Sequence, residues 1–174
     1  MARLPYADPD TEATRPLAQR IVAERGSILH LYQMLLHSPS VAKGWLGYLT
    51  AIRQQSTLSG AMREMVIIRV AQINRAPYEA EQHIPIARQE GVSADKLEVL
   101  DKWVDSSLFD ETERAVLAYT DAMTRNVQVD DVTFEQVKKA FEAQQLIELT
   151  ATVAAYNMVS RFLEALQIHS TDHR

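Results

Sequence analysis

Three ionisable side chains in residues 62–91 stand out because their types and spacing suit proton transfer. Glu64 interrupts a segment that is otherwise strongly apolar, and Glu79 and His83 lie four residues apart, on one face of a helix. A histidine exchanges its proton near neutral pH, and a neighbouring carboxylate can orient it or act as a base itself. The stretch therefore predicts a catalytic set in which His83 is a general acid/base and Glu64 or Glu79 tunes it.

The helices that must position these groups follow from hydrophobic periodicity. Residues 62–74 are apolar nearly all round, which predicts a buried helix. Pro77 begins a second helix at the position where a missing N–H costs nothing, and Pro85 is expected to kink that helix beside His83. Gly91 fits the left-handed position that follows a helix C-terminus. The two helices would thus bring Glu64 and His83 into one region.

The remaining chain also predicts helices, and no segment has the alternation or hairpin turns of strands. Further helices are expected at about residues 17–25, 28–36, 41–54, 94–103, 111–124, 134–143 and 145–166. Ser59 is expected to cap the buried helix. For four of the other helices, the expected N-terminal caps are Ser27, Ser93, Asp110 and Thr133. We expect residues 1–15 to form an extended N-terminal arm, residues 16–169 one helical domain, and residues 170–174 a fraying tail.

Composition excludes several classes of function. The chain has 174 residues, 47% of them hydrophobic, and a net charge of −5, which suits one globular domain and disfavours nonspecific nucleic-acid binding. It has no long uncharged apolar run and no signal-peptide pattern, so we expect no membrane association and a cytoplasmic location. The absence of cysteine excludes disulfides, thiolate metal sites and a thiol-dependent peroxidase mechanism.

Polar residues on the apolar helices extend the candidate site. Tyr78 accompanies Glu79, and the last long helix carries Glu148, Asn157 and Arg161. Because an unpaired buried charge is costly, these groups are expected to satisfy one another. In one interpretation they form a network that only fixes helix register. In the other they line a pocket.

In that pocket, Arg161 or Arg69 would bind a substrate carboxylate or enolate through a forked contact. Asn157 and Tyr78 would complete the substrate side. A competing hypothesis makes Glu64, Glu79 and His83 a metal site with one histidine and two carboxylates.

Three segments carry a resemblance to a known family: HSPSVAKGW, APYEAEQH and LIELTATVAAYNMVSRFLEAL. Over residues 30–168 the chain resembles the carboxymuconolactone decarboxylase family within the alkylhydroperoxidase D-like superfamily. In the peroxidase branch, a glutamate is followed by a Cys-x-x-Cys pair and a histidine. These positions fall on Glu64, Ala76, Glu79 and His83, so both cysteines are absent and the chain resembles the cysteine-free branch.

The resemblance implies an all-α, single-domain helical bundle that forms a homo-oligomer, a dimer, trimer or hexamer. It also implies lyase-type chemistry without a cofactor, such as decarboxylation or acid–base catalysis at a lactone or carbonyl group. The substrate would be a small carboxylate or lactone, since the related decarboxylases act on a small anionic lactone. The alternative is a non-catalytic helical oligomer, or a ligand-binding protein, that has lost the redox thiols.

Overall fold

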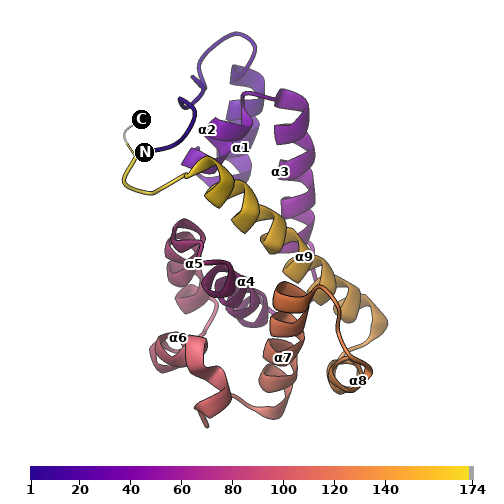
Figure 1. Cartoon of the computed structure of the whole chain (residues 1–174). Coiled ribbons are helices and arrows are strands. Elements are labelled where there is room, and N and C mark those ends of the chain that lie inside the picture. Colours follow the sequence, from indigo (N-terminus) through magenta and orange to yellow (C-terminus); the bar gives the residue numbers. More distant parts are fainter. Residues whose placement is uncertain (173–174) are drawn as a thin grey trace. The chain divides into compact units, whose positions relative to one another are not determined.

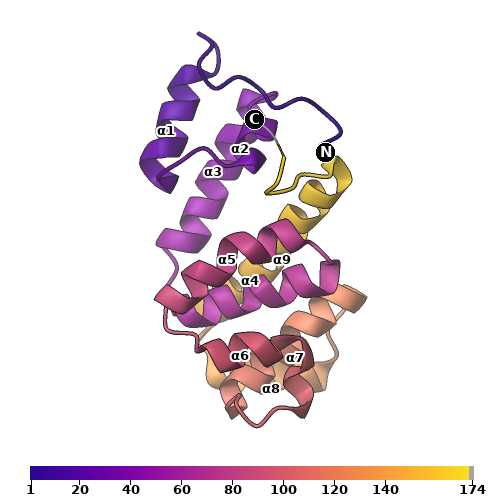
Figure 2. The same cartoon turned by 90° about the vertical axis from the view of Figure 1, so that its left-hand side faces the viewer.

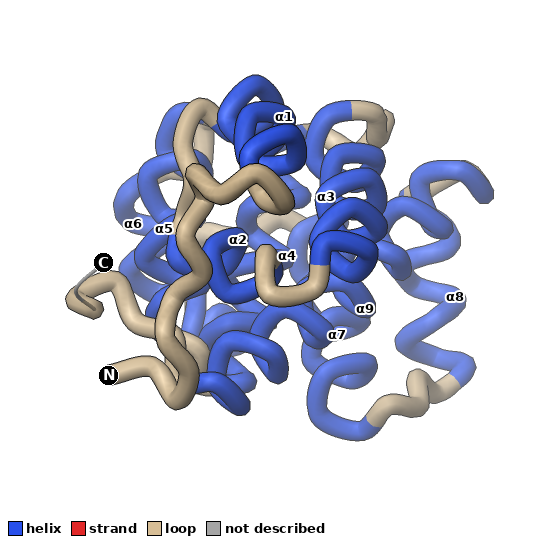
Figure 3. Tube along the Cα trace, turned by 90° about the horizontal axis from the view of Figure 1, so that it is seen from above, coloured by secondary structure: helices blue, strands red, loops and turns tan. Residues whose placement is uncertain are grey.

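The computed structural model describes residues 1–172, and over that range the chain is helical with no strand (Figure 3). The all-α prediction is therefore confirmed. The helices follow one another in the order α1 (Arg15–Arg25), α2 (His30–Leu35), α3 (Pro39–Gln54), α4 (Gly60–Asn74), α5 (Pro77–Gln89), α6 (Ala94–Val99), the 3₁₀ helix η1 (Leu100–Asp105), α7 (Glu111–Asn126), α8 (Asp131–Ala140) and α9 (Ala143–Leu166). None of these helices is both long and apolar enough to cross a membrane.

Most helix ends follow local signals in the sequence. The side chains of Ser59 and Ser93 accept hydrogen bonds from backbone N–H groups in the first turns of α4 and α6. Asp110 and Glu113 form the expected capping box of α7. Gly91 follows α5 with a φ of 97°, as expected for the residue after a helix C-terminus.

Two predicted caps are wrong. Helix α2 begins after Leu29 without a side-chain cap, so Ser27 does not cap it. Helix α8 begins three residues earlier than expected because Asp130 caps it and accepts from the N–H of Thr133, which lies inside the helix. A carboxylate three residues upstream competes well for the N–H groups of the first turn, which explains the difference.

The chain forms two compact units, Met1–Gln55 together with the segment from Leu163 onward, and Ser56–Phe162 (Figure 1). In the first unit the N-terminal arm is bonded to the C-terminal segment. The backbone N–H of Arg3 donates to the carbonyl of Leu166 at 2.9 Å, and the hydroxyl of Tyr6 donates to Asp172 at 2.6 Å. Asp172, which lies in the expected tail, thus accepts a hydrogen bond from the arm. Residues 173–174 lie outside the described part of the chain.

The second unit carries the candidate site. Helix α4 packs against α5 and α7, and α7 packs against α8 (Figure 2). Its core contains Met65 and Ile68 of α4, Ala87 of α5 and Leu117 of α7. Because α4 is apolar nearly all round, it is enclosed by its neighbours, and its polar side chains are buried with it. This burial places Glu64 in the interior.

Candidate functional site

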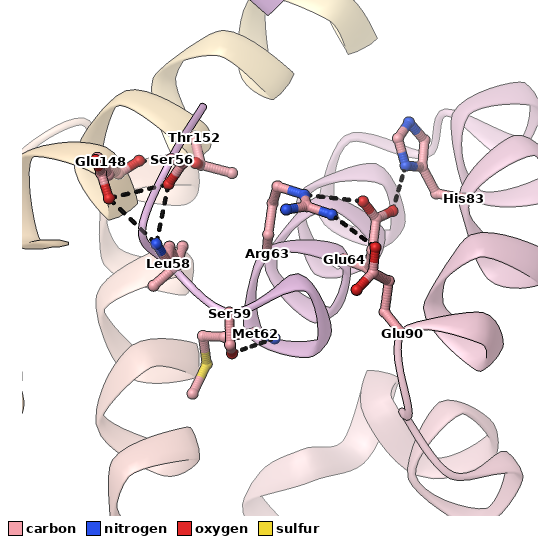
Figure 4. A network of polar contacts seen from close by, with 10 residues as sticks. All are labelled: Ser56, Leu58, Ser59, Met62, Arg63, Glu64, His83, Glu90, Glu148 and Thr152. Carbon is pink, nitrogen blue, oxygen red and sulfur yellow. Dashed lines mark hydrogen bonds and ion pairs between the residues drawn. The ribbon is translucent and has the colours of Figure 1, made fainter. Parts of the chain in front are cut away.

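A buried acid–imidazole pair joins α4 and α5 in the second unit (Figure 4). Nδ1 of His83, on α5, is 2.6 Å from Oε2 of Glu64, on α4. Glu64 is fully buried and His83 is 7% exposed. A carboxylate accepts hydrogen bonds, so the ring carries a hydrogen on Nδ1 and would exchange a proton with a ligand through Nε2. Glu64, one of the two carboxylates expected beside the histidine, thus bonds it.

The cation beside this pair is Arg63, which sequence reasoning missed. Nε of Arg63 donates to Oε1 of Glu64 at 3.1 Å, and Nη2 donates to Oε1 of Glu90 at 3.2 Å (Figure 4). Arg63 is only 8% exposed. A cation near a helix N-terminus is opposed by the helix dipole, so its position early in α4 was the available hint that a carboxylate holds it there.

Glu79 lies on α5, as expected, and accepts a hydrogen bond from α9. The hydroxyl of Ser160 lies 3.1 Å from both carboxylate oxygens of Glu79, which is 2% exposed. Glu79 also occupies the first turn of α5, where the helix dipole favours negative charge. The ring of Tyr156, also on α9, meets His83 edge-on with centroids 5.0 Å apart.

Ser160 and Tyr156 were not anticipated, although both lie one turn apart in the apolar stretch of the last helix. Tyr78, which was anticipated, is buried on the same turn of α5 as Glu79. Its role in binding a substrate stays a prediction.

The two arginines expected to bind a substrate bond residues other than Glu64, Glu79 and His83 in the contacts that the structure shows. Arg69 is buried and makes a forked ion pair with Asp121, with distances of 2.6 and 2.5 Å, and its third nitrogen donates to the carbonyl of Asp101. Arg161 is exposed and bonds Asn157 on its own helix at 2.6 Å. Both guanidinium groups thus have other structural partners, and a role in substrate binding stays a prediction for each.

The polar residues of α9 have two further explanations. Asn157 accepts from Asn74 at 3.1 Å and donates to Thr124 at 3.0 Å, so it joins the ends of α4 and α7 to α9. Its expected contact with a substrate stays a prediction. Glu148 instead accepts from the loop before α4, including the N–H of Thr57 at 2.8 Å. This residue anchors a loop and is not part of the His83 cluster.

The metal hypothesis gains no support from the side-chain arrangement. Among residues 1–172, no three histidine, aspartate or glutamate side chains converge as metal ligands would. Within the proposed set, Nδ1 of His83 is already bonded to Glu64, while Glu79 accepts from Ser160.

A cavity of about 800 Å³ lies elsewhere in the same unit, between η1, α7 and α8. Trp103, Arg114 and Lys139 are among the residues that line it, and the Glu64–His83 pair is not.

Comparison with known proteins defines the class. Residues 39–122 match the model of the carboxymuconolactone decarboxylase family. The uncharacterised protein YnjA of Escherichia coli (strain K12) is 33% identical over 131 residues, which cover 74% of this chain and 69% of that one. The chain therefore belongs to the carboxymuconolactone decarboxylase family, and it is a member without cysteine.

Solved structures confirm the fold. The alkylhydroperoxidase AhpD core of a peroxidase-related protein from Ralstonia eutropha JMP134 has a TM-score of 0.83 and 16% identity, covering 98% of this chain and 93% of that one. A variant of the debrominase Bmp8, in complex with 2,3,4-tribromopyrrole, has a TM-score of 0.82 and 17% identity, covering 97% and 93%. At these identities the likeness concerns the helical arrangement alone.

Proposed function

We propose that this protein catalyses proton transfer on a small carbonyl or carboxylate compound, in a decarboxylation or in acid–base catalysis at a lactone or ketone. His83 would be the general acid/base. The buried 2.6 Å hydrogen bond between Glu64 and His83 is the observation that carries the proposal. It supports the proposal because it holds the imidazole by Nδ1, so that Nε2 would exchange protons with the substrate.

Glu79 supplies a second buried carboxylate, on the same helix as His83. It shares a face of α5 with His83 and is nearly fully buried. Two carboxylates around one imidazole suit a reaction in which one group holds the ring and the other interacts with the substrate. In this proposal Glu64 holds His83, and Glu79 acts on the substrate as a base or a hydrogen-bond partner.

The family name supports this class of reaction, because it denotes decarboxylation of a lactone. The fold alone does not settle the chemistry, since a debrominase shares it and one fold hosts several activities. A thiol mechanism is not proposed, because the chain has no cysteine to carry it.

The second candidate is a non-catalytic helical protein in which the cluster fixes helix register. The complete burial of Glu64 favours this alternative, because a register-fixing ion pair works best away from water. The role of a non-catalytic protein of this kind would not depend on proton transfer by His83.

The two candidate functions predict different results in an assay of proton exchange on the substrate. The protein is incubated in D₂O with a panel of β-keto acids and small lactones, and deuterium incorporation beside the carbonyl is followed by NMR together with substrate loss. We expect the wild type to accelerate at least one compound and His83→Ala to lose roughly 100-fold or more of that rate, the usual contribution of a general acid/base. The exposed His37 is the matched control, and His37→Ala should keep the rate.

Melting temperatures show whether each variant is folded. A folded His83→Ala protein with undiminished exchange would overturn the proposal. A wild type without exchange on any compound, combined with a large stability loss in His83→Ala, would support the non-catalytic alternative.

A further inference from the structure

The ion pair at the candidate site continues to the surface. Glu90 follows the last residue of α5, and its side chain is 42% exposed. It accepts from Arg63, which in turn donates to the fully buried Glu64, and Glu64 bonds His83 (Figure 4). Four charged or titratable groups thus form an unbroken series from solvent to the imidazole.

A glycine makes room for the surface end of this series. Gly60 is the first residue of α4, and a methyl group there would overlap the carboxylate of Glu90. The Glu90 side chain therefore lies directly over the first turn of α4 while its other oxygen bonds Arg63. This contact ties the C-terminal end of α5 to the N-terminal end of α4, the two helices that carry His83 and Glu64.

From this geometry we infer that Arg63 and Glu90 are positioning residues for His83. Arg63 bonds both the buried Glu64 and the exposed Glu90. Its positive charge partly neutralises Glu64, and so controls how strongly Glu64 stabilises a protonated His83. Glu90, at the surface, partly neutralises Arg63 and so weakens the effect of Arg63 on Glu64. The inference rests on the proposed function only in taking His83 as the working group, because the positioning itself can be measured without turnover.

The sign of each effect follows from the charges on and around the Glu64–His83 pair. His83 bonds Glu64 of α4 and meets the ring of Tyr156 of α9. Arg63 bonds Glu64, Glu90 after α5 bonds Arg63, and Glu79 lies one turn before His83 on α5. Removing Arg63 leaves Glu64 with His83 as its cationic partner, so the pair holds its proton to higher pH. Removing Glu90 leaves Arg63 to act on Glu64 alone, so the pair releases its proton at lower pH.

The test is an NMR titration of histidine-labelled full-length protein, with the His83 signals assigned by their loss in His83→Ala. We expect Arg63→Gln to raise the pH midpoint of His83 by about one unit, because the variant removes a nearby charge of the same sign as the protonated imidazole. Glu90→Gln should lower it by roughly 0.3 units, since the charge that it removes is partly screened by solvent.

The Gly60→Ala variant tests the contact between Glu90 and Arg63 without removing a charged group. It forces Glu90 away from Arg63 while leaving the formal charge unchanged, so it should shift the midpoint in the same direction as Glu90→Gln. Glu98, an exposed acid on α6, is the matched control, and Glu98→Gln should leave the midpoint within 0.1 units (roughly the screened effect of a distant surface charge).

Equal midpoints in Glu90→Gln and Glu98→Gln, or a wild-type midpoint in Arg63→Gln, would overturn the inference. If Arg63→Gln does not fold, the variants Glu90→Gln and Gly60→Ala still test the inference. The proposed function fails separately, because a protein without any turnover would still show these shifts if the positioning is correct.

Discussion

Replacing Glu148 with glutamine tests whether one carboxylate anchors the loop before α4. Its Oε2 accepts from the hydroxyl of Ser56 at 3.0 Å, from the N–H and hydroxyl of Thr57 at 2.8 and 2.7 Å, and from the N–H of Leu58 at 3.2 Å. Its Oε1 accepts from Gln144 at 3.0 Å. Burial raises the pKa of Glu148, but the bonds from Gln144, Thr57 and Ser56 outweigh burial and lower that pKa to about 2.

The magnitude and its pH window follow from this shift. A change from 4.5 to about 2 corresponds to at most roughly 3 kcal/mol of folding free energy at neutral pH. Glu148 is partly exposed, so solvent screening reduces the expected value to about 1–2 kcal/mol. Because the folded-state pKa is depressed, the stabilisation is complete above pH 4.5 and is lost as the pH falls toward 2.

The assay is urea unfolding of the wild type, Glu148→Gln and Glu142→Gln at pH 7 and at several values down to pH 2.5. Glu142 is an exposed acid just before α9, so its variant controls for the change in net charge. Glu148→Gln should be less stable than the wild type by about 1–2 kcal/mol at pH 7, and the gap should shrink as the pH is lowered. A gap that is constant with pH, or one equal to that of Glu142→Gln, would refute the reasoning.

Three further predictions follow from other parts of the chain. Arg69→Met should lower the free energy of unfolding by about 2–3 kcal/mol, because it leaves Asp121 without its forked partner; urea unfolding measures this, and a loss below that of Asp121→Asn would contradict it. Tyr6→Phe should cost about 1 kcal/mol at pH 7, and the difference should disappear in acid, because the tyrosine bond is the main cause of the lowered pKa of Asp172. Thermal unfolding at pH 7 and below pH 3 tests this, and an equal loss at both would count against it. Metal-free wild-type protein should show no dithiol-dependent reduction of hydroperoxides, and consumption of the reductant would contradict the exclusion of thiol chemistry.

The helices could be predicted because their signals are local. Pro77, Ser59 and Gly91 act within one turn of their own position, and the structure uses all three as expected. The Glu64–His83 pairing could be anticipated for a different reason. Each residue lies on a helix whose apolar neighbours require burial, and a buried carboxylate must find a hydrogen-bond donor.

The identity of the cation could not be predicted in the same way. Arg63, Arg69 and Arg161 all lie on apolar helices, and their sequence neighbourhoods are alike in character. Which carboxylate each one meets depends on how the helices pack, and that is a property of contacts between distant residues. Arg69 forms an ion pair with Asp121, and Arg161 donates a hydrogen bond to Asn157. Arg63 bonds Glu64.

The bonds around Glu64 would allow the proton exchange that we propose for His83. Burying a carboxylate costs several kcal/mol unless its oxygens are bonded, and Arg63 and His83 bond one oxygen each. The Nδ1 hydrogen remains on the imidazole when Nε2 gains or loses a proton, so both bonds to Glu64 persist through the change. His83 can therefore alternate between acid and base without leaving a buried charge unbonded. Register alone would be satisfied by a partner with a fixed charge, whereas general acid–base catalysis requires this freedom.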